Sequence, residues 1–304
     1  MTAALDAFDR HRRLLFSVAY QMLGSVADAE DVVQDAWLRW SAADRGGVAH
    51  PRAYLVRITT RLALDRMDSA RARRESYVGP WLPEPLLTGT TPVASGPAAT
   101  DPGDAAELAD QVSFALLVVL ETLTPAERAV FVLREAFGLS TAEVARTLGR
   151  SEAAVRQMAH RAKEHVQARR PRFDVDRQAQ LEVTERFLAA CAGGDVPALL
   201  AALAPDVVLI SDGGGKAKAA LRPISGADKV ARFIAGTAAE GMAIPDVRVA
   251  LADVNGAPAI VAWAGTEPLM TMSLVVADGR IQQVLIVRDP DKLGGLAVAA
   301  QERT

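Results

Sequence analysis

One stretch of the chain carries a group of side chains that suit hydrogen bonds to base edges and phosphates: Arg156, Gln157, His160, Arg161 and Lys163. Arginine can form two bonds to guanine, and glutamine can form two to adenine. Apolar residues recur every three or four positions between them, at Val155, Ala159, Ala162 and Val166. This spacing predicts a helix from Ser151 to about Gln167 with a buried stripe and a polar outward face. A helix about 10 to 12 Å wide fits the roughly 12 Å major groove of DNA.

Two helix starts before this stretch predict the elements that position it. Thr124 and Ser140 can each cap a helix with the hydroxyl group, while Glu127 and Glu143, three residues later, can reach back to the backbone. Pro125 fits the first helical position because an N–H there would have no helical partner.

A turn between two helices is predicted at Gly149, and Ser151 is the expected N-cap of the second helix. The sequence therefore predicts a helix-turn-helix from Leu123 to Arg170. Short helical hairpins with basic surfaces also occur in proteins that never touch DNA, so the segment alone leaves that alternative open.

The composition of the 304-residue chain predicts a soluble, cytosolic protein of two or three domains. No uninterrupted apolar run reaches the roughly 18 residues that a membrane span needs, and Met1 to Arg13 contains no secretory signal. The single cysteine, Cys191, excludes an internal disulfide and a multi-cysteine zinc site, and it is typical of a small buried side chain. We expect no metal, no cofactor and no membrane contact.

The formal net charge of −3 hides two basic segments. Residues 52–74 contain seven arginines and two aspartates, and residues 140–173 contain eight basic and three acidic residues, so each segment has a local charge of +5. Two separate basic segments indicate two contacts with a polyanion.

Three helices are predicted before residue 76: Asp6 to Leu23, Ser25 or Asp28 to about Trp40, and Pro51 to about Arg74. The second helix has an acidic outer face, and the third carries the first basic segment. Both faces are also typical of solvated helix surfaces, so the residues alone leave that interpretation open.

Three features of the sequence carry a family resemblance. They are the acidic stretch DAEDVVQDAWLRW at residues 28–40, the basic stretch PRAYLVRI at residues 51–58, and the helix-turn-helix that follows. Together, over residues 5–170, they resemble the extracytoplasmic-function (ECF) class of bacterial sigma factors. The resemblance implies two all-α domains that bind core RNA polymerase and promoter DNA.

The resemblance also implies roles for residues. The acidic helix would dock on the clamp of core RNA polymerase through Glu30, Asp31, Gln34 and Asp35. The third helix would read and help to melt the −10 promoter element, with contacts from Arg52, Arg57, Arg61 and Arg66. The helix-turn-helix would read the −35 element through Ser151, Arg156, Gln157, His160, Arg161 and Lys163.

Residues 76–107 are predicted as a linker, because six prolines between Ser76 and Asp104 favour an extended chain. A flexible spacer gains nothing from exposing a tryptophan beside a leucine, so we expect one piece to dock on a surface: Trp81, Leu82, Pro83, Glu84 and Pro85. This piece resembles the linker motif of the sigma subgroup that has a fused C-terminal SnoaL-like domain. An apolar helix is expected from Leu108 to Leu123.

The pattern after Asp176 predicts an α+β domain. Two helices, about Asp176 to Ala192 and Asp195 to Ala204, precede a β-rich part that contains one further helix, Gly226 to Glu240. Strands are expected at residues 207–210, 247–254, 259–265, 270–276 and 281–287. This layout resembles the SnoaL-like (NTF2-like) cone, in which a bent sheet wraps a helix around a pocket.

Two short motifs stand out in this domain. The first is Asp212, Gly213, Gly214, Gly215 and Lys216. It is not a phosphate-binding P-loop, because Ile210 and Ala217 stand where glycine and Ser or Thr are needed. A glycine turn between strands is one interpretation; the resemblance implies another, a motif associated with control of sigma activity. A second motif of that subgroup usually begins with asparagine and reads here Asp289, Pro290, Asp291, Lys292 and Leu293.

Catalysis is not expected from the C-terminal domain. Relatives of this fold that isomerise or cyclise substrates combine a carboxylate with a Tyr or His donor. All four histidines and all three tyrosines of this chain precede residue 176. A carboxylate such as Asp212 or Glu267 could still be a base, but nothing in the sequence gives it a partner.

The sequence thus predicts a multidomain protein, with two all-α sigma domains at residues 1–75 and 108–172, the linker between them, and an α+β SnoaL-like domain at residues 176–304. The first hypothesis is an ECF sigma factor whose C-terminal domain packs back onto the sigma core, through the Trp81 to Pro85 piece and the Asp212 to Lys216 loop, and regulates it in cis. The alternatives are a one-component helix-turn-helix regulator that senses a small molecule, and an isomerase or cyclase with a DNA-binding appendage. The sequence leaves open whether the cone binds a small-molecule ligand.

Overall fold

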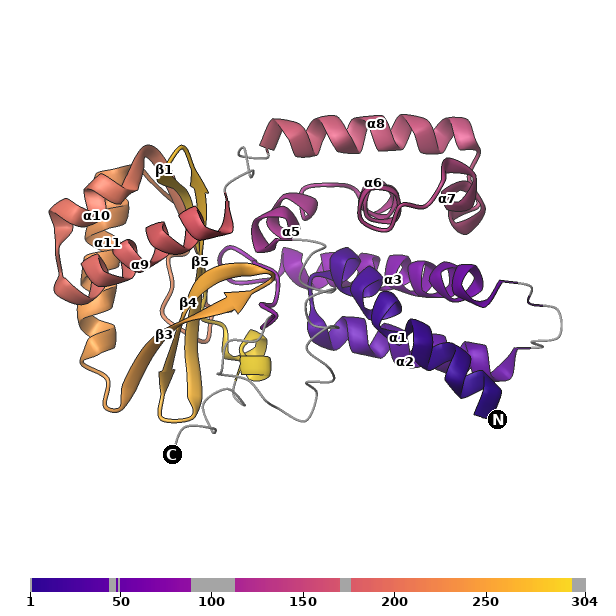
Figure 1. Ribbon diagram of the computed structural model, residues 1–304, viewed down its shortest axis with the longest axis horizontal. Helices are drawn as coiled ribbons and strands as arrows, with labels where there is room; N and C mark the ends of the chain where they lie inside the picture. Colours follow the sequence, from indigo (N-terminus) through magenta and orange to yellow (C-terminus); the bar gives the residue numbers. More distant parts are fainter. Residues whose placement is uncertain (1, 44–47, 49, 89–112, 170–175, 297–304) are drawn as a thin grey trace. The chain divides into compact units, whose positions relative to one another are not determined.

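The computed structural model describes residues 2–43, 48, 50–88, 113–169 and 176–296, without the side chains of residues 2–4 and 70–73. The chain divides into two compact units (Figure 1). We call Met1–Ser76 and Leu117–Arg169 the helical unit, and Tyr77–Leu116 and Arg170–Thr304 the sheet unit. The two segments that we predicted as separate sigma domains thus lie within one unit.

Three long helices form the first part of the helical unit: α1 (Thr2–Leu23), α2 (Val26–Ala42) and α3 (Pro51–Glu75). Each packs against the other two. The Ser25 hydroxyl caps α2 by accepting from the Asp28 N–H, and Phe8 meets Trp37 edge to face at 5.1 Å between ring centroids. The three predicted helices are confirmed, with α1 beginning four residues earlier than expected.

The second part of the helical unit consists of α6 (Pro125–Phe131), which continues as the π-helical turn η2 (Val132–Ala136), then α7 (Thr141–Leu148) and α8 (Glu152–Arg169). Both predicted capping boxes form, at Thr124 with Glu127 and at Ser140 with Glu143. Gly149 adopts a left-handed conformation with φ of 63°, so the predicted helix-turn-helix is confirmed. The apolar helix expected from Leu108 is α5 (Phe114–Leu120), and residues 108–112 lie outside the described residues.

The sheet unit contains a six-stranded sheet in the order β2-β1-β6-β5-β4-β3. The strands are β1 (Leu203–Asp212), β2 (Ile224–Ser225), β3 (Val247–Val254), β4 (Ala257–Ala264), β5 (Glu267–Ala277) and β6 (Arg280–Val287). β1 and β6 are parallel, and the other neighbouring pairs are antiparallel. Register shifts interrupt three of the pairings, and such irregularities bend a strand. The predicted α+β layout is confirmed, and the short β2 was not predicted.

Two tight hairpins connect strands that follow each other along the chain. Asn255 and Gly256 join β3 to β4, and Asp278 and Gly279 join β5 to β6, all four with φ between 51° and 74°. Two successive residues with positive φ are what a type I′ turn requires, and Asn-Gly and Asp-Gly are its favoured sequences. These turns set the register of the curved sheet.

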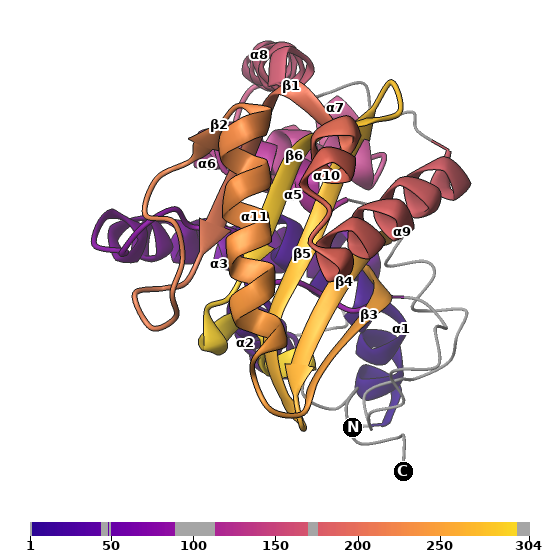
Figure 2. The ribbon, with the colours of Figure 1, turned by 90° about the vertical axis from the view of Figure 1, so that its left-hand side faces the viewer.

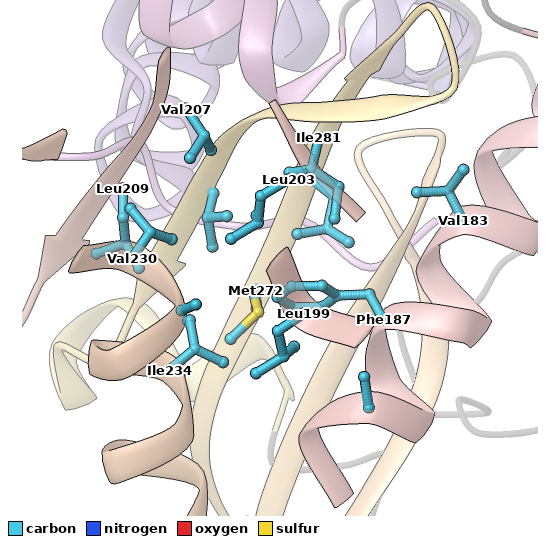
Figure 3. Close-up of a cluster of buried hydrophobic side chains, with 14 of the residues drawn as sticks. Val183, Phe187, Leu199, Leu203, Val207, Leu209, Val230, Ile234, Met272 and Ile281 are labelled. Carbon is cyan, nitrogen blue, oxygen red and sulfur yellow. The ribbon is translucent and has the colours of Figure 1, made fainter. Parts of the chain in front are cut away.

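Three helices cover one face of the sheet: α9 (Arg177–Gly193), α10 (Val196–Ala202) and α11 (Ala227–Met242); Figure 2 shows them lying across the strands. A single hydrophobic cluster fills the space between these layers. In Figure 3, Phe187 of α9 and Leu199 of α10 point toward Met272 of β5. Burial of such side chains, at roughly 25 cal/mol per Å² of apolar surface, holds helices and sheet together.

Candidate functional site

The helix α8 has the buried stripe and the polar face that its sequence predicts. Val155, Ala162 and Val166 are buried, and Ala159 is half-buried. The Ser151 hydroxyl caps the helix by accepting from the Ala154 N–H at 3.2 Å. The residues predicted to contact DNA all lie on the exposed face: Ser151, Arg156, Gln157, His160, Arg161 and Lys163.

The arginines on this face have carboxylate partners, of which Glu152 is exposed and Glu127 is half-buried. Arg156 lies 3.5 Å from Glu152, one helical turn away, and Arg161 lies 3.0 Å from Glu127 of α6. Burial alone would raise the pKa of Glu127, but the bonds from Thr124 and Arg161 lower it below its ordinary value. Exposed ion pairs contribute only about 0 to 1 kcal/mol, so phosphates or bases could replace these partners.

The arginines of α3 differ among themselves. Arg52 is exposed, and Arg57 lies 5.3 Å from the centre of the Tyr54 ring. The Nε–H of Arg61 donates to the Thr147 carbonyl of α7 at 3.2 Å. Arg66 is held by α2, through a 2.9 Å bond to Asp28 and a second ion pair to Asp31. Two of the four residues predicted at the −10 element are therefore engaged within the helical unit.

The acidic face of α2 is accessible to solvent. Glu30, Asp31 and Gln34 are exposed and Asp35 is half-buried. Glu30 forms a 3.2 Å ion pair with Arg12 of α1, and Asp31 pairs with Arg66 of α3. The face could dock on a basic partner surface, but Asp31 also links two helices of its own unit.

Buried arginine links join the two parts of the helical unit. Arg128 of α6 is 1% exposed, and its Nε–H donates to the Gln21 carbonyl at 2.8 Å. Glu121 accepts from both Arg128 and Arg74, and Arg74 donates to the Leu23 carbonyl at 2.7 Å. The last carbonyls of a helix have no partner within the helix, so these cations bind the C-terminal end of α1 and hold α6 against it. These links could not be predicted from the sequence, because Arg128 lies in an ordinary helical pattern.

The three motifs that were predicted to be regulatory meet inside the sheet unit. The Asp212 carboxylate is fully buried and accepts from the Tyr77 hydroxyl at 2.7 Å, the Leu82 N–H at 2.8 Å and the Lys292 ammonium at 2.7 Å. Lys292 also donates to the Leu82 carbonyl and lies over the rings of Tyr77 and Trp81, at 4.7 and 4.2 Å. We call Tyr77, Leu82, Asp212, Asp289 and Lys292 the Tyr77 cluster.

Asp289, which replaces the usual asparagine of the second motif, belongs to this cluster. Its carboxylate lies 2.6 Å from the Tyr77 hydroxyl, whose single proton is shared between Asp289 and Asp212. Asp289 also caps the 3₁₀ turn η3 (Pro290–Lys292) by accepting from the Asp291 N–H. Burial, followed by the bonds to Asp289 and Asp212, raises the pKa of Tyr77, so its hydroxyl keeps its proton.

The glycines of the first motif allow close approach of the backbone. A Cβ at Gly213 would overlap the Ala217 carbonyl, and a Cβ at Gly214, with φ of 59°, would overlap the Asp289 carboxylate. Lys216, at the end of the motif, is exposed and pairs with Asp291. The loop is therefore both a turn and part of the Tyr77 cluster. Within the sheet unit the motif contacts the Trp81 to Pro85 piece through the Leu82 N–H and the Asp212 carboxylate, and contact of either piece with the sigma core stays a prediction.

The expectation that Asp212 has no Tyr partner was wrong. The partner is Tyr77, which lies in the predicted linker and far from the domain in sequence. Glu267, the other carboxylate considered, is exposed at the start of β5.

The predicted linker makes a second attachment to the sheet. Leu87 pairs with Val254 as an antiparallel bridge, and the Leu86 carbonyl accepts from the Asn255 N–H at 2.8 Å. The Thr88 N–H donates to the Asp253 carbonyl, also at 2.8 Å. Residues 77–88 are thus held at both ends, while the predicted linker from residue 89 to 107 lies outside the described residues.

Within the described ranges, no helix is both long and apolar enough to cross a membrane. The same part of the chain holds no group of three or more His, Cys, Asp or Glu side chains arranged for a metal ion.

Comparison with known proteins assigns the parts of this fold. Sigma-70 region 2 matches residues 7–73, Sigma-70 region 4 matches residues 113–166, and the SnoaL-like domain matches residues 184–284. The chain is 41% identical over 301 residues to the ECF RNA polymerase sigma factor SigJ of Mycobacterium tuberculosis H37Rv, covering 96% of this chain and 93% of the relative. It is 34% identical to the probable ECF sigma factor SigI of the same strain, covering 95% and 94%.

The crystal structure of the M. tuberculosis extracytoplasmic function sigma factor SigJ has the same fold. It aligns with a TM-score of 0.75 at 38% identity, over 96% of this chain and 98% of that one. The matches favour the sigma factor hypothesis over the one-component regulator, and the α2 and α8 faces described above lie inside the matched regions. The chain therefore belongs to the ECF RNA polymerase sigma factors, with a SnoaL-like domain fused at its C-terminal side.

Proposed function

We propose residue roles for this sigma factor: α8 reads the −35 element, α3 reads the −10 element, and the acidic face of α2 binds core RNA polymerase, in the cytoplasm where the polymerase works. One observation carries the proposal. The basic face of α8 is exposed over its whole length and lies opposite a buried stripe, within the segment that matches Sigma-70 region 4. That is the arrangement by which a helix enters the major groove.

Transcription by reconstituted holoenzyme tests these roles. We expect the Arg156→Ala/Arg161→Ala variant to lose roughly 1 to 3 kcal/mol of promoter binding for each base contact and to relax specificity at −35, or to flatten the salt dependence where a contact goes to phosphate. Arg232→Ala, on the exposed face of α11, is the matched control. Promoter binding by the double variant that equals the control at every salt concentration would remove the assignment to α8.

We propose that the compact helical unit is a resting arrangement. The −10 and −35 elements lie about 25 base pairs apart, or about 85 Å at 3.4 Å per base pair. A compact unit of about 130 residues has a radius of gyration of only about 14 Å. The α3 and α8 helices can reach both elements only after the contacts of Arg61 and Arg128 with α7 and α1 are broken.

We propose that the sheet unit regulates this opening in cis through the Tyr77 cluster. The cluster holds the chain from Tyr77 onward, directly after α3 ends at Glu75, and residues 77–116 connect α3 to the second part of the helical unit. Released from the sheet, residues 77–88 could extend by up to about 40 Å, at about 3.4 Å per residue. A longer connection between α3 and the second part of the helical unit would favour the arrangement in which these two parts are separated.

Transcription also tests the regulatory role. The full-length chain is compared with a chain that ends at Arg169 and with Trp81→Ala, Asp212→Ala and Lys216→Ala, at equal holoenzyme concentration. We expect the first three variants to change initiation 5- to 150-fold, the range that a coupling of about 1 to 3 kcal/mol gives. Lys216→Ala should have the smallest effect because its ion pair is exposed. Equal initiation by all five proteins would favour a ligand sensor without cis control.

We also propose that the sheet unit is not catalytic. Asp212 and Tyr77 satisfy each other and Lys292 inside the cluster, and neither of them lines the cavity of this unit. Turnover of a substrate by the purified chain would contradict this.

A further inference from the structure

The sheet unit encloses a cavity of about 600 Å³ between α9, α11 and the concave face of the sheet. Its wall is mainly apolar and includes Phe233, Ile234, Ile260, Met270 and Met272. This volume lies within the range of about 300 to 1,000 Å³ that is typical of small-molecule sites. At about 30 Å³ for each water-sized group, it holds about twenty non-hydrogen atoms.

The rim of the cavity carries three charged side chains, Lys218, Glu240 and Arg288. Lys218 and Glu240 neutralise each other in a 2.7 Å ion pair, and the bond from Lys218 lowers the pKa of Glu240 below its ordinary value. Arg288 therefore supplies the net charge of +1. Cys191, which also lines the wall, stays neutral because burial raises the pKa of its thiol to about 12.

The protein orients the guanidinium of Arg288 but leaves part of its hydrogen-bonding capacity unused. Its Nη1–H donates to the Lys218 carbonyl at 2.8 Å, which fixes the guanidinium. Its Nε–H is buried and has no hydrogen-bond partner among the described residues. An unpaired buried donor is unfavourable, and a guanidinium edge matches a carboxylate through two parallel bonds.

Apolar side chains at this cavity also face solvent. Met242 is 56% exposed and Val249 is 39% exposed, and both line the opening. An apolar ligand body would cover them, which is favourable in water. We propose that the cavity binds a hydrophobic monoanion, with an apolar body of about ten to twenty carbon atoms inside and its carboxylate on Arg288.

The cavity and the Tyr77 cluster are formed by neighbouring residues of the same chain segments. Side chains alternate along a strand, so Ser211 lines the cavity while Asp212 belongs to the cluster, and Arg288 lines the cavity while Asp289 belongs to the cluster. A ligand on Arg288 would thus act one residue away from the contacts that hold residues 77–88. A signalling role for the ligand rests on the proposed function, whereas binding itself does not.

Calorimetric titration of the full-length chain, without polymerase, tests the proposal separately from any sigma activity. The probes are decanoate, 1-decanol and decyltrimethylammonium, each below its micelle concentration. We expect decanoate to bind at least tenfold more tightly than the other two. Arg288→Met, which keeps the stem but not the charge, should remove this preference, and Arg288→Lys should keep part of it.

Two further variants complete the test. Ala238→Phe, on the cavity side of α11, should weaken all three probes, and Arg222→Met, an exposed arginine of the same unit outside the cavity, should change nothing. Circular dichroism and the melting temperature confirm that each variant is folded. Equal affinity for the anion and the cation, unchanged decanoate binding by Arg288→Met, or no binding of any probe would overturn the proposal.

Discussion

The two basic helices of this sigma factor, α3 and α8, lie in segments of equal local charge but hold their arginines differently. Arg156 and Arg161 of α8 are exposed and pair only through surface contacts. Arg61 and Arg66 of α3 bind a carbonyl of α7 and carboxylates of α2. The charge pattern does not distinguish the two helices, whereas the structure shows that Arg61 and Arg66 are engaged by other helices of the same unit.

Packing explains the difference. The α8 helix presents one side to α6 and α7 and the rest to solvent, whereas α3 contacts α1, α2, α6 and α7. A helix surrounded by other elements finds protein partners for its cations. We infer that α8 can bind DNA directly, and that α3 must first separate from the second part of the helical unit.

The strongest way to break this comparison is to remove the buried link at Arg128. We expect Arg128→Leu to lower the free energy of unfolding of the helical unit by about 3 to 5 kcal/mol, because Glu121 and the Gln21 carbonyl lose a buried partner. Urea denaturation followed by circular dichroism measures this. Arg146→Leu, an exposed arginine of α7, is the control, and equal stability of the two variants would show that Arg128 does not join the two parts.

A second change sharpens the contrast on α3. We expect Arg66→Ala to lose about 1 kcal/mol of stability, since its partner Asp28 is largely buried, and Arg156→Ala to lose less than about 0.5 kcal/mol, as is usual for exposed sites. Urea midpoints of the two variants give the comparison. A larger loss for Arg156→Ala would reverse our account of the two helices.

The acidic face of α2 gives a third test, because Asp31 has a structural partner and Asp35 has none among the ion pairs of the described residues. We expect Asp35→Lys to weaken assembly with core polymerase while changing stability by less than about 0.5 kcal/mol, and Asp31→Lys to weaken both. Fluorescence anisotropy with core polymerase measures assembly. Normal assembly by both variants would show that the acidic face of α2 contacts solvent and does not bind core polymerase.

The smallest expected effect is the pH dependence of the helix-turn-helix. Bonds from Ser140 lower the pKa of Glu143 below its ordinary value of 4.5, and the pKa of Glu127 is lowered as well. Lowered carboxyl pKa values stabilise the fold above about pH 4.5 and lose that effect as the pH falls. Each contributes at most about 1 kcal/mol, because both groups are half-buried at the surface and solvent screens their interactions. The Thr124→Ala/Ser140→Ala variant should lose the acid-sensitive part in a pH series of melting temperatures.

Local chemistry in the sequence predicted much of the helical unit. Thr124, Ser140, Gly149 and Ser151 act over three or four residues, so their caps and turns can be recognised without knowing the fold. The apolar runs of the sequence predicted five strands of the sheet. The sixth, β2, has two residues and is too short to show a hydrophobic pattern. These elements depend mainly on neighbours in sequence.

The contacts that join distant segments could not be predicted in this way. Tyr77 and Asp212 are separated by 135 positions, and Arg128 and Gln21 by 107. Nothing local distinguishes Arg128 from an exposed helical arginine. The sequence contains Arg288 but does not show that its Nε–H is buried or that its side chain lines a cavity, because both depend on how the sheet curves.

The most direct test of the central claim is the distance between α3 and α8 in the free protein and in the promoter complex. Dyes are attached to cysteines at the exposed positions Asp68 and Gln167 in a Cys191→Ala background, and energy transfer is measured. We predict a short distance in the free chain that increases toward about 85 Å, the separation of the two elements at 3.4 Å per base pair, in the holoenzyme on promoter DNA. The same distance in both states would contradict the account.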